Sequence, residues 1–186
     1  MAEGNTGVLP DHELLALVDR HAIRSDLALD ADQVQPASLD LRLAFDAYRI
    51  RASFLPGPNR SVADLLQEPG IELHRIDLTA KGAVLETGCV YLVPLQESLR
   101  LPPGLSGRAN PKSSTGRIDV FTRVVTNRSK AFDEIPTAYS GPLWLEISPR
   151  TFPILVRPGD RLAQLRLRRG KAAETSEKLV SIDLES

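Results

Sequence analysis

Two hydroxyls, two cations and one carboxylate lie within the stretch from Gly107 to Glu146, and these residue types bind phosphates and transfer protons. The segment PKSSTGR supplies four of them, Lys112, Ser113, Ser114 and Arg117. The carboxylate belongs to Glu146, near the end of the stretch. Together they are suited to a phosphorylated ligand and to acid/base chemistry.

The local sequence around these serines favours an anion site. Pro111 sets a turn, Ser113 is expected to cap a short helix, and Gly116 lets the backbone approach a ligand closely. Hydroxyls, free N–H groups and flanking cations hold oxyanions through charge-assisted hydrogen bonds. The spacing is not that of a P-loop. A serine-capped turn with two solvated cations remains the alternative from these residues alone.

Glu146 lies in the run LWLEI, which reads as a strand. Alternation places Leu143, Leu145 and Ile147 on one face, with Trp144 and Glu146 on the other. Partial burial beside an aromatic ring would raise the pKa of this carboxyl, by up to ~3 units if it were deeply buried, toward the range of a general acid/base. A solvent-facing strand glutamate is the alternative.

The segment FDEIPTAYSG, which precedes that strand, carries Asp133 and Tyr139. A carboxylate and an aromatic ring on a loop suit a sugar hydroxyl and a stacked base. Both types are also ordinary turn residues, so a structural role stays open.

Composition excludes several classes of function. The chain has 186 residues with 23 Lys+Arg against 24 Asp+Glu, which predicts one near-neutral domain without a field that recruits nucleic acid or membrane. No membrane-spanning run or signal-peptide pattern is present, so we expect a cytoplasmic protein. The single cysteine, Cys89, is expected to be a buried structural thiol, and three scattered histidines do not suggest a metal site.

The elements that must position these residues are mostly strands. The segment PDHELLALVDRHAI predicts an amphipathic helix from Asp11, as N-cap, to about Arg20. Next, SLDLRL predicts a strand with Asp40 and Arg42 opposite its leucines. A Pro- and Gly-rich surface excursion with a helical turn at Val62 to Gln67 is expected to follow. From Ile71, short apolar segments between turns indicate a barrel, sandwich or jelly roll.

The ends of the chain differ from its middle. Residues 1–7 are small and polar and are expected to be disordered, with the β domain spanning 8–170. Residues 171–186 lose apolar density, and their SIDLES echoes SLDLRL at 38–43. They are either a tail or the start of a second copy of the domain.

Four segments together resemble the dCTP deaminase branch of the dCTP deaminase/dUTPase superfamily. They are the N-terminal helix with VQPASLDLRL, the KSSTGR segment, YSGPLWLEIS, and FPILVRPGDRLAQLRL. The resemblance implies a mainly β fold, a distorted β-barrel or jelly roll of the dUTPase-like type with an N-terminal helix. It also implies a homotrimer with sites between subunits.

The same resemblance implies an enzyme that hydrolyses dCTP to dUTP and ammonia. By this resemblance Glu146 matches the catalytic glutamate, and Ser113 and Arg117 match residues that hold the attacking water. Lys112 and Ser114 match triphosphate contacts, and Asp133 falls near the family's sugar contact. Zinc is not expected, because the H-x-E and P-C-x-x-C motifs of zinc deaminases are absent from this sequence. Mg²⁺ bound through the triphosphate is expected, since two cations do not neutralise about four charges.

Several features depart from the family pattern. Lys112 stands where an arginine is usual, and Asp119 lies near the expected anion site. The family's nucleotide-closing segment has no recognisable counterpart after Gly170. Two alternatives therefore stay open: a non-catalytic nucleotide-binding half-domain of a tandem protein, and a bifunctional enzyme that also splits dUTP to dUMP. An OB-like nucleic-acid binder is disfavoured by the scarcity of aromatic residues.

Overall fold

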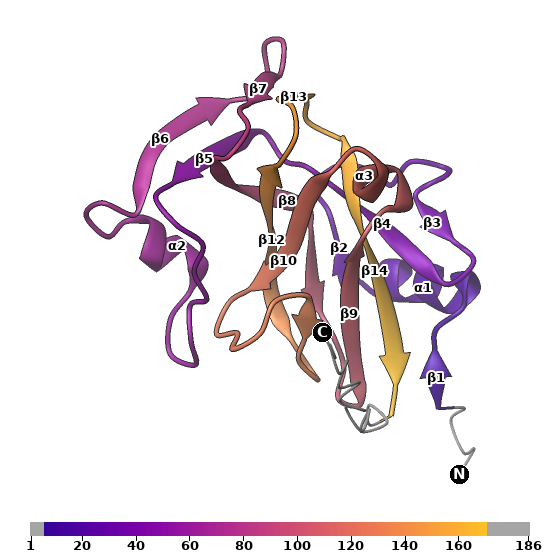
Figure 1. Ribbon diagram of the computed structural model, residues 1–186. Coiled ribbons are helices and arrows are strands. Elements are labelled where there is room, and N and C mark those ends of the chain that lie inside the picture. The colour runs from indigo at the N-terminus through magenta and orange to yellow at the C-terminus, as the bar shows by residue number, and fades with distance from the viewer. Residues whose placement is uncertain (1–5, 171–186) are drawn as a thin grey trace, which may run out of the picture.

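A computed structural model describes residues 6–170 of the chain (Figure 1). Strands dominate, which confirms the mainly β prediction with a helix near the N-terminus. The strands form two open six-stranded sheets and one two-stranded sheet. The helices are α1 (Asp11–Asp19), α2 (Val62–Leu66) and α3 (Ser113–Arg117).

The first sheet has the order β11-β9-β14-β4-β3, with β1 paired to β14. Its strands are β1 (Gly7–Val8), β3 (Val34–Gln35), β4 (Ser38–Arg42), β9 (Leu105–Pro111), β11 (Glu134–Ile135) and β14 (Arg161–Arg169). The second has the order β10-β12-β8-β5-β6, with β2 paired to β8. Its strands are β2 (Ile23–Arg24), β5 (Asp46–Ile50), β6 (Glu72–Asp77), β8 (Val90–Arg100), β10 (Val120–Thr126) and β12 (Ser140–Pro149). The two-stranded sheet pairs β7 (Ala83–Leu85) with β13 (Ile154–Val156).

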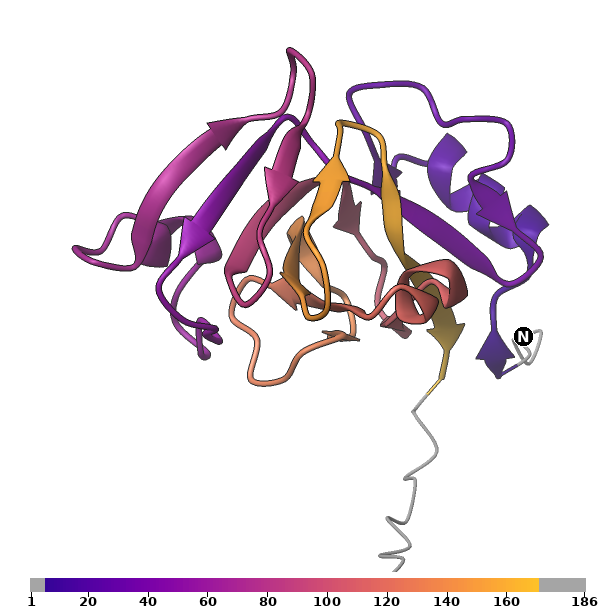
Figure 2. The same cartoon turned by 45° about the horizontal axis from the view of Figure 1, so that its top comes forward.

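Both larger sheets contribute to one main hydrophobic core. Leu39 and Leu41 of the first sheet and Leu143, Leu145 and Ile147 of the second belong to it. Figure 2 shows β5 and β6 at one side of the molecule and α1 with β3 at the other. The strand alternation predicted for β12 is confirmed, because its leucines and isoleucine face this core.

Trp144 belongs to a second, smaller core on the opposite face of β12. This cluster includes Val62 and Leu66 of α2, packed with Trp144 and Val125. The helical turn predicted at Val62 to Gln67 is therefore confirmed, and a capping box formed by Ser61 starts it. The excursion that contains it does more than cover the surface, since it buries the outer face of the second sheet.

The N-terminal helix begins at Asp11 as predicted and ends one residue early, at Asp19. The expectation that Asp11 is its N-cap was wrong. Pro10 occupies that position, and the Asp11 carboxylate instead accepts a hydrogen bond from the neighbouring His12 N–H. The expectation of disorder was also wrong at Gly7, which pairs with Arg169. Residues 1–5 lie outside the described part of the chain.

The predicted strand at SLDLRL is confirmed as β4, and its polar side is buried as well. Arg42 donates through Nε to Glu97 Oε1 at 2.8 Å, and Gln33 Nε2 donates to the same oxygen at 2.8 Å. Asp40 is paired with Lys112. These charges therefore enter the interior as compensated pairs, because a lone buried charge is costly.

Two smaller expectations concern Cys89 and the C-terminal tail. Cys89 is half-buried and packs against the main core. The prediction for residues 171–186, a tail or the start of a second copy, lies outside the described residues. In the part of the chain that is described, none of the helices has the length and apolarity to span a bilayer.

Candidate active site

Glu146 projects from β12 on the same face as Trp144, away from the main core. Only 3% of its surface is exposed. The β10–β12 ladder places Arg123 directly opposite it, and antiparallel partners in register share one face of the sheet. A buried carboxylate and a cation are thus brought together by backbone pairing.

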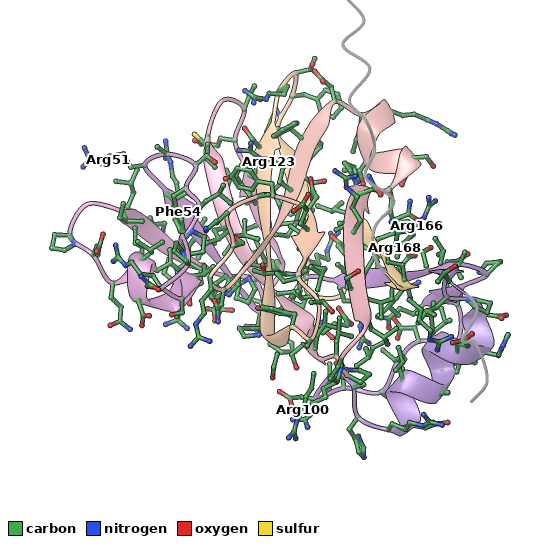
Figure 3. The ribbon with its side chains drawn as sticks, turned by 90° about the horizontal axis from the view of Figure 1, so that it is seen from below. Arg51, Phe54, Arg100, Arg123, Arg166 and Arg168 are labelled. Atoms are coloured by element: carbon green, nitrogen blue, oxygen red, sulfur yellow. The ribbon has the colours of Figure 1, made fainter. Side chains whose placement is uncertain are left out.

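Arg123 forms an ion pair with Glu146. Its Nε and Nη2 donate to the same oxygen, Oε1, at 3.0 and 2.6 Å. Nη2 also donates to Ser53 Oγ at 2.7 Å, and the guanidinium lies over the Phe132 ring at 3.7 Å from its centroid. In Figure 3, Arg123 lies between Phe54 on one side and Arg166 and Arg168 of β14 on the other.

Asp133 lies close to this pair. It adopts a left-handed backbone conformation with φ of 61°, and its Oδ1 accepts a hydrogen bond from Val124 N at 2.7 Å. Burial raises the pKa of Asp133 above its ordinary value, and the charge of Glu146 adds to the increase, whereas Arg123 lowers it. The structure therefore gathers two carboxylates around one arginine.

The KSSTGR segment forms α3 at the junction of β9 and β10. Ser113, Ser114 and Arg117 are exposed. The expectation that Ser113 caps this helix was wrong: Lys112 occupies the N-cap position and no side chain caps the helix. Thr115, which the sequence did not single out, anchors α3 by donating to the Leu162 carbonyl at 2.9 Å.

Lys112 is held by the buried carboxylate of Asp40. Asp40 Oδ2 also lies 3.9 Å from Arg161 Nη1, and Arg161 pairs with Asp30 and Asp32. Because Asp40 comes from SLDLRL, this pairing links two segments that are distant in the sequence. It fixes the N-terminal end of α3 against the first sheet.

Tyr139 is nearly buried, and its hydroxyl is engaged by backbone. It donates to the Pro142 carbonyl at 2.6 Å and accepts from Asn127 N at 3.1 Å. Burial raises the pKa of Tyr139 above its ordinary value. Tyr139 lines a cavity of about 460 Å³ that Asp64 and Arg128 also line. Because two backbone groups engage it, the hydroxyl has a structural function.

The structure therefore separates the expected residues into two groups. Glu146 and Asp133 lie around Arg123, and α3 carries the exposed serines and Arg117. Within residues 6–170, no hydrogen bond or ion pair joins Ser113, Ser114 or Arg117 to Glu146.

Sequence reasoning missed Arg123, Ser53 and Phe132. The signal for Arg123 was its place in VFTRVV, an alternating strand that precedes the Glu146 strand. The long segment between the two strands hid the register. Ser53 and Phe132 come from loops, whose contacts have no periodicity to reveal them.

Comparisons with known proteins identify the family to which this chain is similar. A family model described as the 2'-deoxycytidine 5'-triphosphate deaminase N-terminal domain matches residues 5–171. A protein of Streptomyces coelicolor named "dCTP deaminase, dUMP-forming" is 32% identical over 168 residues, covering 86% of this chain and 78% of that protein. A protein of the same name from Methanosphaera stadtmanae is 25% identical over 164 residues, covering 85% and 77%.

A solved structure gives the same result at the level of the fold. The 2'-deoxycytidine 5'-triphosphate deaminase of Agrobacterium tumefaciens is 60% identical, with a TM-score of 0.86 over 90% of this chain. The match covers 49% of that protein, so this chain spans about half its length. On the evidence of the family model, the relatives and the shared fold, the chain belongs to the dCTP deaminase family.

Proposed function

We propose that this chain catalyses the hydrolytic deamination of dCTP to dUTP and ammonia. The observation that carries the proposal is Glu146, a carboxylate buried on a strand face and paired with Arg123, in a member of the dCTP deaminase family. The names of the relatives support dCTP as substrate. Acting on a free nucleotide fits a cytoplasmic protein.

In this reaction Glu146 is the general base and then the general acid. It accepts a proton from water as the oxygen adds to C4 of the cytosine ring, and ring nitrogen N3 takes up a proton. The resulting tetrahedral carbon holds both hydroxyl and amine. Proton transfer from the hydroxyl to the amine breaks the C4–N bond, which releases ammonia and leaves the C4 carbonyl of dUTP.

The residues of α3 supply the remaining roles in the proposal. Ser113 and Arg117 hold the attacking water, whereas Lys112 and Ser114 contact the triphosphate. Because α3 is exposed and makes no described bond to Glu146, we place these residues next to the Glu146 of another subunit in a homotrimer. Size-exclusion chromatography with light scattering tests the oligomer.

Asp133 and Tyr139 complete the proposed site at the sugar and base. Asp133 Oδ1 is engaged by Val124 N, so Oδ2 is the oxygen available to a sugar hydroxyl. Tyr139 offers only its ring, because backbone groups engage its hydroxyl.

In this proposal Mg²⁺ binds together with the triphosphate of the substrate. Among residues 6–170 there is no group of three or more His, Cys, Asp or Glu side chains that could hold a metal. Mg²⁺ usually keeps several waters and binds through substrate phosphates, so a triphosphate can bring the ion without a cluster of protein ligands. Its contribution would be to neutralise the phosphate charge that Lys112 and Arg117 leave uncompensated.

Two further candidates have specific support. The relatives from Streptomyces coelicolor and Methanosphaera stadtmanae are named dUMP-forming, which favours a bifunctional enzyme that also releases pyrophosphate. The coverage of about half of the Agrobacterium protein favours a half-domain that requires a second one for activity. Chromatography of the products separates dUTP from dUMP, and tight dCTP binding without turnover would identify the half-domain.

Glu146→Gln tests the central role. We expect loss of at least about 100-fold in turnover, because general acid/base catalysis contributes roughly 10²–10⁴-fold. Glu134→Gln is the matched control, since Glu134 is an exposed glutamate of β11. Equal turnover by wild type and Glu146→Gln would contradict the proposal.

A further inference from the structure

Arg123 holds Glu146 by one oxygen and leaves the other free. Both of its donors reach Oε1, and no described hydrogen bond reaches Oε2. Oε2 is also absent from the fully buried side-chain atoms that lack a partner. It therefore keeps some contact with solvent, although the residue as a whole is nearly buried. Water can reach Oε2 while Oε1 is engaged.

Arg123 is itself fixed by groups from three segments of the chain. Its guanidinium lies over Phe132 and also 5.0 Å from the centroid of Phe121. Ser53 Oγ accepts a hydrogen bond from Arg123 Nη2, which orients the plane of the guanidinium. An exposed ion pair would be mobile and weak, whereas this one is held by stacking and by hydrogen bonds. The position of Oε1 is thus determined by the fold.

The charges around Glu146 make Arg123 necessary. Arg123 on β10 forms the ion pair with Glu146, and the charges of Arg123, Arg108 and Glu146 all act on Asp133, just before β11. Without Arg123, Glu146 would lose the cation that compensates its charge in a poorly solvated site.

From this geometry we infer that Arg123 is a positioning residue for deamination, which fixes Glu146 through Oε1 and makes Oε2 the atom that accepts and returns the proton. The inference rests on the proposed function. No additional reactant is required, because the proton that Oε2 takes from water is the one it delivers to the nucleotide. The arginine stays paired with Oε1 throughout, so the acid form remains in place for its donation.

The test is steady-state kinetics of dCTP deamination by the 186-residue chain with Arg123→Gln and Arg123→Lys. We expect Arg123→Gln to lower kcat by about 100-fold, the effect of a misplacement of about 1 Å, with KM changed less than about threefold. A lowered kcat with a nearly unchanged KM is the signature of a misplaced base rather than of lost substrate binding. Arg123→Lys keeps the charge, so its kcat should be about tenfold higher than that of Arg123→Gln.

Arg150→Gln is the matched control, because Arg150 also lies over Phe121, at 5.4 Å, but from the exposed bend that follows β12. It should retain the kcat and KM of wild type. Wild-type kcat in Arg123→Gln, or a lowered kcat that lysine does not recover, would overturn the inference alone. No turnover by the wild-type chain would overturn the proposed function and the inference together. If Arg123→Gln does not fold, Arg123→Lys decides, because its kcat should lie about tenfold below that of wild type, and a wild-type kcat would overturn the inference.

Discussion

Replacing Arg123 by methionine should destabilise the fold by about 3 kcal/mol, because it leaves a buried carboxylate without its cation. Removing one partner of a buried ion pair costs roughly 3–5 kcal/mol. The lower end applies here, since Glu146 is 3% exposed but the Arg123 side chain is 26% exposed, so water partly replaces the arginine. For comparison, small domains are stable by about 5–15 kcal/mol in total.

The partner substitution should cost less. Glu146→Gln leaves Arg123 with Ser53, with its ring contacts and with water, so we expect a loss of about 1–2 kcal/mol. The double variant carries no unpaired buried charge and should lose only about 2 kcal/mol. The two single effects therefore exceed the double effect, and the coupling energy should be about 2–3 kcal/mol.

Urea unfolding of the four proteins measures this cycle. Protomer concentration must be held constant, because assembly would add to the apparent stability. The m-value should stay unchanged while the midpoints shift. Additivity of the two substitutions within about 0.5 kcal/mol would refute the reasoning, because it would mean that the two side chains do not interact in solution.

Three further predictions concern a titration, a buried network and a turn. Burial raises the pKa of Asp133 above 3.8, so stability from this group is full below that pH and is lost as pH rises through the raised pKa. Asp133→Asn should therefore gain stability relative to wild type between about pH 3 and about pH 7, as seen by thermal unfolding; a constant difference would contradict this. Arg42→Met leaves the buried Glu97 carboxylate without its cation and should lower the free energy of unfolding by about 3–5 kcal/mol, as measured in urea. A decrease below about 1 kcal/mol would show that the ion pair is dispensable. Gly82→Ala should cost at least about 1–2 kcal/mol, because φ is 77° and a Cβ would collide with the Val156 carbonyl oxygen; an unchanged melting temperature would contradict it.

The strands and the central helix segments were predictable because their signals are local. Period-2 alternation in LWLEI placed Leu145 in the main core and Glu146 on the other face, as observed. The apolar spacing after Pro10 gave α1 to within one residue. Capping was less predictable, since Asp11 and Ser113 are good caps by type but the backbone placed each one position inside its helix.

The surroundings of Glu146 could not be predicted, because they depend on pairing between distant segments. The register that sets Arg123 opposite Glu146 follows from the β10–β12 ladder. Its other contacts come from loops that carry Ser53 and Phe132. Likewise, the partner of Lys112 is Asp40, 72 residues away in the sequence. Alternation assigns a face to each residue, and only the fold brings faces together.

Mass spectrometry of the nucleotide formed from dCTP in H₂¹⁸O with Mg²⁺ is the most direct test of the account. If water adds at C4 with Glu146 as base, the uracil product should carry one ¹⁸O at O4 and ammonia should appear in equal amount. The Glu146→Gln variant should form at least about 100-fold less of it, and Glu134→Gln should form as much as wild type. Unlabelled dCTP recovered intact from the wild-type chain, or labelled product formed equally by Glu146→Gln, would contradict the account.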